Sequence, residues 1–180
     1  MFIQTQITPN PNSLKFLPEK KVSKIGPLEV INKKDSKNEL IRNILSINGV
    51  KGIFLSENFL SVNKSEDKNW EDLKHIIISL INDYYSNGKN VVLDKDHSSD
   101  EKVESTEIEN KIIKILETKI RPAVARDGGD IRFKEFKDGV VTVQLQGSCS
   151  GCPSSKMTLK QGVENLLRHY IPEVKEVLAL

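Results

Sequence analysis

A polar, acidic stretch over residues 88–105 limits the possible fold of this chain more than any other feature. It is rich in serine, its acidic residues outnumber its basic ones, and its one apolar patch lies at residues 91–93. This composition buries too little apolar surface to offset the entropy lost on ordering, which predicts a flexible acidic linker. The 180-residue chain is therefore expected to form two small domains, residues 1–87 and residues 106–180.

In the first domain, the apolar pattern switches between strand spacing and helix spacing. Apolar residues flank the Pro-Asn-Pro-Asn run at residues 9–12, which predicts a hairpin. Helical spacing follows over residues 40–47, and two apolar runs meet at residues 57–58, where a second hairpin is expected. An apolar helical face then covers residues 70–84. Residues 18–36 show no clear pattern and are expected to form a loop, so the predicted order is ββαββα.

The second domain begins with a capping box at residues 106–109, which predicts the start of a helix. Pro122 is expected to kink or trim this helix, and the glycines at residues 128–129 to end it. A strand with a one-residue slip in its alternation, residues 131–136, turns back at Asp138-Gly139 into a second strand. A cysteine-containing loop, a helix and a short strand follow. The predicted order is αββαβ, and the whole chain is predicted to be an α+β protein of two small domains.

Composition argues against several classes of function. A formal net charge of +2 is too small to indicate a nucleic-acid or membrane partner. Apolar runs such as residues 76–78 fall far short of the about 20 residues that span a bilayer. The N-terminus does not resemble a targeting segment, and no Ser-His-Asp set, phosphate loop or acid–base pair occurs at a meaningful spacing. We therefore expect a protein that is not an enzyme and that works where it is made.

The chain has only two cysteines, Cys149 and Cys152, separated by Ser-Gly. This pair closes too small a loop to hold a fold together, and in a reducing compartment the spacing points to metal binding or thiol chemistry. Pro153 is expected at the first position of the following helix, which would make Cys152 its N-cap. The positive end of the helix dipole would then stabilise the thiolate form of Cys152.

Two sulfur ligands cannot complete an iron–sulfur or zinc site, because both need four ligands. The histidines are poorly placed to help: His75 is in the first domain, His97 in the linker and His169 several turns along the last helix. A second copy of the chain would supply two more cysteines by symmetry, which is the simplest closed solution. The motif alone leaves three possibilities open, namely metal or cluster binding, dithiol redox chemistry, and two structural cysteines.

Several sequence motifs resemble those of the Nfu family, the stand-alone relatives of the C-terminal domain of NifU. In the second domain these motifs are Ile120-Arg-Pro122, Asp127-Gly-Gly-Asp130-Ile131, Gly147-Ser-Cys-Ser-Gly-Cys-Pro-Ser154 and Ile171-Pro-Glu-Val174. The first domain is similar to the N-terminal domain of the mitochondrial and alphaproteobacterial type, through residues 8–16, Gly49-Val50, residues 59–64 and Trp70. Residues 18–38 match the family poorly.

The resemblance implies an iron–sulfur cluster carrier. A 4Fe–4S cluster would be shared between two subunits, bound by Cys149 and Cys152 of each, and transferred to apo iron–sulfur proteins. The upstream cluster assembly machinery would be its donor. A dithiol oxidoreductase and a structural zinc-bridged dimer are the alternatives. Because Met1 lies directly before the N-terminal domain, we expect the cytoplasm of a bacterium, or the mitochondrial matrix if the sequence is a processed organellar form.

For three further residues we expect a structural role rather than ligand binding. Asp127 and Asp130 flank two glycines, and we expect a helix C-cap and turn with solvated carboxylates rather than a cation site. Trp70 is expected to pack in the core or at the domain edge. The Pro-Asn-Pro-Asn run is consistent with either a stiff hairpin turn or a docking loop.

Overall fold

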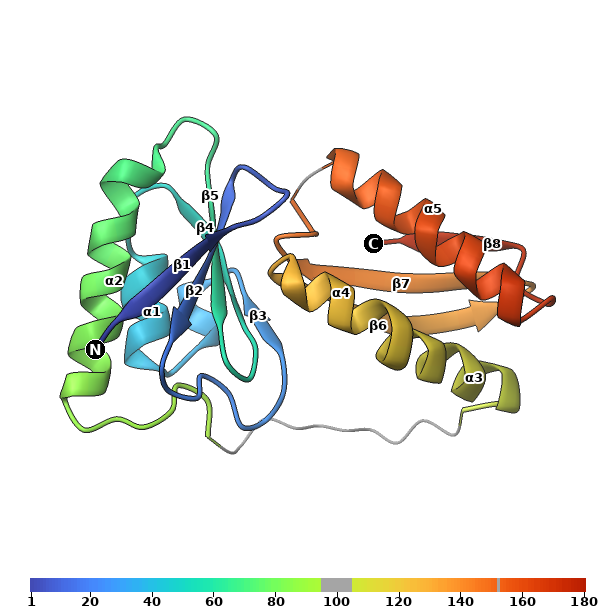
Figure 1. Ribbon diagram of the computed structural model, residues 1–180, viewed down its shortest axis with the longest axis horizontal. Helices are drawn as coiled ribbons and strands as arrows, with labels where there is room; N and C mark the ends of the chain where they lie inside the picture. The colour runs from blue at the N-terminus through green and yellow to red at the C-terminus, as the bar shows by residue number, and fades with distance from the viewer. Residues whose placement is uncertain (95–104, 152) are drawn as a thin grey trace. The chain divides into compact units, whose positions relative to one another are not determined.

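The computed structural model describes residues 1–94, 105–151 and 153–180, which form two compact units on either side of residues 95–104 (Figure 1). The predicted α+β class and the two-domain organisation are confirmed. The first unit contains β1 (Ile3–Ile7), β2 (Ser13–Pro18), β3 (Leu28–Val30), the 3₁₀ turn η1 (Lys33–Asp35), α1 (Glu39–Leu45), β4 (Val50–Leu55), β5 (Leu60–Lys64) and α2 (Trp70–Ser86). The second contains α3 (Glu107–Ile115), the π turn η2 (Leu116–Ile120), α4 (Arg121–Arg126), β6 (Gly129–Lys137), β7 (Val140–Gly147), α5 (Pro153–Tyr170) and β8 (Glu176–Ala179). None of the described helices is both long and apolar enough to cross a bilayer.

The first unit is built on a five-stranded antiparallel sheet in the order β1-β2-β5-β4-β3. Helices α1 and α2 pack together on one face of it (Figure 1). Ile41 of α1, Ile77 of α2 and Leu60 of β5 are fully buried in the shared core. Both predicted hairpins are present, since β1 pairs with β2 and β4 with β5.

Residues 18–36, which we expected to form a loop, contain the short strand β3 and the turn η1. Strand β3 has only three residues and pairs with β4, so that Val30 lies opposite Ile53. Val22 between β2 and β3 is completely buried. The expected order ββαββα is therefore corrected to βββαββα, because a strand this short is stabilised by a distant partner and has no pattern of its own.

The start of the predicted linker is packed against the first unit. Val92 is buried in its core, and the backbone N–H groups of Val92 and Leu93 both donate to the carbonyl of Val22 at 3.0 Å. The Tyr84 hydroxyl donates to the carbonyl of Val91 at 3.1 Å. Residues 91–93 therefore belong to the packed unit, although we expected them in the linker. Residues 95–104 lie outside the described residues, and a flexible linker there stays a prediction.

The second unit has a three-stranded sheet in the order β6-β7-β8, with β6 antiparallel and β8 parallel to β7. Helices α3, α4 and α5 cover one face of it (Figure 1). The predicted slip in β6 is a β-bulge between Phe133 and Glu135. Asp138 and Gly139 both have positive φ, 52° and 80°, as the tight hairpin turn requires.

The first helical region of this unit continues through the position of Pro122. The capping box is confirmed, because the Thr106 side chain accepts from the Glu109 N–H and the Glu109 carboxylate accepts from the Thr106 N–H. The helix widens into η2 before Pro122 and resumes as α4, since proline has no N–H to continue an ordinary turn. Gly128, with φ of 85°, ends α4 as expected.

Candidate metal centre

The cysteine loop connects the end of β7 to the start of α5. Gly147, the last residue of β7, has a positive φ of 69° that turns the chain out of the sheet. Cys149 is buried and belongs to the apolar core of the second unit. Helix α5 begins at Pro153, as the sequence predicted. Cys152 lies outside the described residues, so its place as N-cap of α5 stays a prediction.

Ser148 ties this loop to the corner between α4 and β6. Its backbone N–H donates to the Gly128 carbonyl at 3.3 Å, and its hydroxyl donates to the Asp127 carbonyl. Within the loop, the N–H and the hydroxyl of Ser150 both donate to the Gly147 carbonyl, at 3.3 and 2.9 Å. The backbone on either side of Cys149 is therefore fixed by hydrogen bonds before any ligand is bound.

Gly129 leaves the space that the Cys149 side chain needs. A Cβ at position 129 would lie 2.8 Å from the Cys149 sulfur and 2.6 Å from the Gln146 carbonyl oxygen, closer than real Cβ atoms approach. We expected Gly129 only to help end the preceding helix. The structure shows that it is the first residue of β6 and that the Cys149 sulfur lies directly against it. Nothing in the local spacing could have predicted this contact, since 20 residues separate the two positions.

Asp130 does not have the solvated carboxylate that we expected. Its side chain is only 6% exposed, and Arg121 binds it with two hydrogen bonds, Nε to Oδ1 at 2.8 Å and Nη2 to Oδ2 at 3.1 Å. Arg132 adds a longer ion pair at 3.8 Å. The hydrogen bond that Arg121 donates to Asp130 raises the pKa of Arg121, although burial of the guanidinium acts in the opposite direction. Asp127 is the C-cap of α4, as expected.

The described histidines are helix residues outside the cysteine loop. His169 is exposed in the last turn of α5, whereas the loop precedes the first turn of that helix, and its ring packs edge-on against Tyr170. His75 is an exposed residue of α2 in the first unit. His97 lies outside the described residues. Within the described ranges, no three His, Cys, Asp or Glu side chains gather closely enough to hold a metal ion.

Trp70 packs at the edge of the first unit's core, as expected. Its ring lies edge-on to Phe16, with ring centroids 6.5 Å apart, and its indole N–H donates to the Pro11 carbonyl at 3.0 Å. Asn10 in the same turn is 3% exposed. These contacts support the interpretation of the Pro-Asn-Pro-Asn run as a stiff turn.

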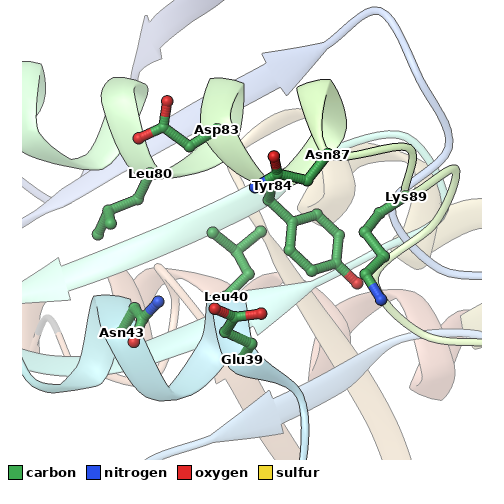
Figure 2. Close-up of a pocket in the computed structure, with 8 residues that line it drawn as sticks. All are labelled: Glu39, Leu40, Asn43, Leu80, Asp83, Tyr84, Asn87 and Lys89. Atoms are coloured by element: carbon green, nitrogen blue, oxygen red, sulfur yellow. The ribbon is translucent and has the colours of Figure 1, made fainter.

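The first unit contains a small pocket. It has a volume of about 220 Å³ and lies between α1 and α2, with Leu40, Leu80 and Tyr84 among its lining residues (Figure 2). Its described lining residues all belong to the first unit, whereas Cys149 belongs to the second.

The two units match two different family models. Residues 112–178 match the NifU-like domain, and residues 3–88 match the N-terminal domain of the Nfu/NifU scaffold proteins. The human protein named "NFU1 iron-sulfur cluster scaffold homolog, mitochondrial" is 43% identical over 180 residues, covering 98% of this chain and 71% of that protein. This chain belongs to the Nfu family of NifU-like proteins. Its second unit carries the cysteine loop, and the first is the Nfu-type N-terminal domain.

The chain matches only part of the length of the other relatives. "NifU-like protein 4, mitochondrial" from Arabidopsis thaliana is 43% identical over 184 residues, and the chain spans 65% of its length. The solution NMR structure of a NifU-like protein from Saccharomyces cerevisiae is 26% identical, with a TM-score of 0.49 over 53% of this chain and 87% of that one.

Proposed function

We propose that this Nfu-family chain binds a 4Fe–4S cluster through Cys149 and Cys152 and passes the cluster to apo iron–sulfur proteins. The observation that carries the proposal is the position of the Cys149 side chain. Its sulfur lies against Gly129 in a loop whose backbone is already held by Ser148 and Ser150. Such a loop limits how far its backbone must move when iron binds. The name of the human relative, an iron–sulfur cluster scaffold, supports the same cargo.

Counting ligands leads us to propose a shared site. Each chain has two cysteines, and a 4Fe–4S cluster is bound by four thiolates. A second copy of the chain supplies the missing two by symmetry, so the cluster-loaded form is a homodimer. In this proposal dimerisation and cluster binding are one event.

A site divided between two subunits is suited to transfer rather than to permanent storage. Ligands within one chain stay close at high effective concentration, whereas a divided site loses two of them whenever the subunits separate. Thiolates of an apo-protein can then replace those of the carrier one at a time, and the upstream assembly machinery reloads it. The proposed role is delivery of a cluster and involves no catalysis.

The compartment also belongs to this proposal. The plant and human relatives are named as mitochondrial proteins, which supports the mitochondrial matrix, the second of the two compartments expected from the sequence. The cytoplasm of a bacterium stays a prediction. Either compartment is reducing, as two thiolate ligands require.

Metal analysis of anaerobically purified protein tests this function against its alternatives. We expect iron and sulfide in equal amounts and a broad visible absorption towards the blue. Zinc in place of iron would instead support a structural zinc-bridged dimer. Protein without metal that interconverts reversibly between dithiol and disulfide would support an oxidoreductase.

A transfer assay tests the carrier role separately. Loaded protein is mixed with an apo iron–sulfur protein, with and without a chelator too bulky to reach a dimer interface. We expect the recipient to be activated equally in both cases, because the cluster is exchanged between ligands without entering solution. If the chelator captures most of the iron, the cluster is released rather than handed over, and the carrier role fails.

A further inference from the structure

An ion pair between the half-buried Arg121 and the buried Asp130 lies one residue along β6 from Gly129 and takes no part in the proposed ligand set. Arg121 is the first residue of α4, and its guanidinium holds both carboxylate oxygens of Asp130 on β6. Paired, planar hydrogen bonds of this kind fix orientation as well as distance. The pair therefore fixes the direction in which α4 leaves the edge of the sheet.

The sequence before Arg121 sets this guanidinium in place. The π turn η2 and Pro122 interrupt the regular helix on either side of it. A π turn inserts extra backbone and rotates the residues that follow it, and such turns are frequent at functional sites. Glu117 in the same turn contacts Arg121 at 3.8 Å and adds to its orientation.

Two routes connect this pair to Cys149. Along β6, Asp130 directly follows Gly129, against which the Cys149 sulfur lies. Along α4, the far end of the helix carries the Asp127 and Gly128 carbonyls that hold Ser148. A change in the angle between α4 and β6 would therefore move both Gly129, against which the Cys149 sulfur lies, and the carbonyl groups that accept hydrogen bonds from Ser148.

We propose that Arg121 and Asp130 are positioning residues for Cys149, keeping the cysteine loop in the closed conformation in which the Cys149 sulfur is buried against Gly129. Asp130 also pairs with Gln146 in the β6–β7 ladder, three residues before Cys149, so the same pair fixes the strand from which the loop departs. The importance of such a closed loop for cluster binding rests on the proposed function. The positioning of Cys149 by Arg121 and Asp130 does not depend on that function.

An ion pair with one buried partner is weak proof of a contribution to overall stability, because desolvation offsets most of its attraction. Its geometric role must therefore be measured at Cys149 and compared with the stability of the rest of the unit. In a full-length Cys152→Ser chain, Cys149 is the only remaining thiol. The rate at which N-ethylmaleimide modifies it reports how often the loop opens.

Three variants are compared in that Cys152→Ser chain. Asp130→Asn removes the charge at constant size, and Arg121→Lys keeps the charge but loses the paired geometry. Arg168→Lys alters an exposed ion pair to Glu164 on α5, at 3.7 Å, and is the matched control. Hydrogen exchange at residues 140–143 of β7, at the opposite end of the strand from the loop, reports the stability of the unit.

Asp130→Asn is expected to raise the Cys149 modification rate about tenfold or more, since hydrogen bonds to charged groups shift an equilibrium by at least that factor. Arg121→Lys should give a smaller rise and Arg168→Lys none, while exchange at residues 140–143 changes much less. An unchanged Cys149 modification rate would overturn the proposal by showing that the ion pair has no role at Cys149. A rise matched by equally faster hydrogen exchange in β7 would also overturn it, because the role would then be purely structural.

A second measurement distinguishes failure of this proposal from failure of the proposed function. The chain with both cysteines, with and without Asp130→Asn, is loaded with cluster and exposed to a small iron chelator. Faster loss of iron from the variant supports the link between positioning and cluster retention, and equal loss contradicts it. If the parent chain takes up no cluster, the proposed function fails while the maleimide rates still decide whether the pair positions Cys149.

Discussion

The two loops of this protein that are richest in turn-forming residues are held differently. In the turn at residues 8–13, the turn's own side chains make several hydrogen bonds: the Thr8 hydroxyl donates to the carbonyls of Asn10 and Ser13, and the Asn10 side chain accepts from the Asn12 N–H. Lys64 of β5 and Trp70 of α2 add hydrogen bonds to Asn12 and Pro11. The cysteine loop has the internal bonds of Ser150 to Gly147, but it also depends on the corner between α4 and β6. Its Ser148 is held by the carbonyls at the end of α4, and Cys149 rests on Gly129 of β6.

This difference has a consequence for function. A turn whose own side chains make several of its hydrogen bonds keeps those bonds when other elements move. A loop held by a distant element can change shape when that element moves, without unfolding of its domain. The cysteine loop should therefore respond to substitutions far from it in sequence more strongly than the Pro-Asn turn does.

The largest effect is expected from the ligands themselves. Changing either Cys149 or Cys152 to serine should abolish cluster binding and transfer, since each change removes two ligands from the dimer. His169→Ala is the control and should leave both nearly intact, because His169 lies at the opposite end of α5. Iron content and visible absorption after reconstitution measure the result. Full binding by either serine variant would contradict the ligand assignment.

Gly129→Ala should have the next largest effect. The added methyl group would displace the Cys149 side chain, so we expect most cluster binding to be lost and the unit to be destabilised by about 1–3 kcal/mol. Gly162→Ala on α5 is the matched control, because a Cβ there has open space and alanine favours the helix by about 1 kcal/mol. Reconstitution and thermal unfolding of both variants test the pair. Equal cluster yields would show that the Gly129 contact has no role in the site.

Thr8→Val tests the turn at residues 8–13. Loss of the hydroxyl breaks its bonds to the Asn10 and Ser13 carbonyls and should destabilise the first unit by about 1–2 kcal/mol, without affecting cluster loading. Urea unfolding followed by the fluorescence of Trp70, the only tryptophan, reports on this unit, because its indole bonds to the same turn. Thr5→Val in β1 is the control and should be nearly neutral. Reduced cluster loading in Thr8→Val would mean that the two loops are coupled.

The smallest effect on binding is expected from removing the first unit altogether. A chain of residues 105–180 retains the cysteine loop, Gly129 and the Arg121–Asp130 pair, so it should take up as much cluster per chain as the full protein. Circular dichroism establishes that the shortened chain is folded. A folded fragment that cannot be loaded would contradict the assignment of the whole site to the second unit.

Features with a local cause were predictable from the sequence. The capping box at residues 106–109, the bulge in β6 and the turn at residues 138–139 all follow from residues close together in the chain. The helix beginning at Pro153 could likewise be identified from the motif, whereas the ligand roles of Cys149 and Cys152 stay predictions. Short-range hydrogen bonds and φ preferences decide these features, and a sequence pattern reports them directly.

Features with a distant cause were not predictable. Ile76 fits the apolar face expected for α2 but is 48% exposed, and Tyr85 is buried instead, because only packing on the sheet selects the buried side. The contact between Gly129 and Cys149 and the pairing of Arg121 with Asp130 arise from the same cause. These supports of the site join residues on different elements, so no local spacing marks them.

The central claim is that one cluster is shared by two chains, and sedimentation of reconstituted protein tests it most directly. Absorbance is followed at a cluster wavelength and at a protein wavelength in the same run. We predict that all cluster absorbance sediments with a dimer, with one 4Fe–4S unit for each two chains, and that removing the cluster reduces the dimer population. A monomer that carries cluster absorbance would contradict the account.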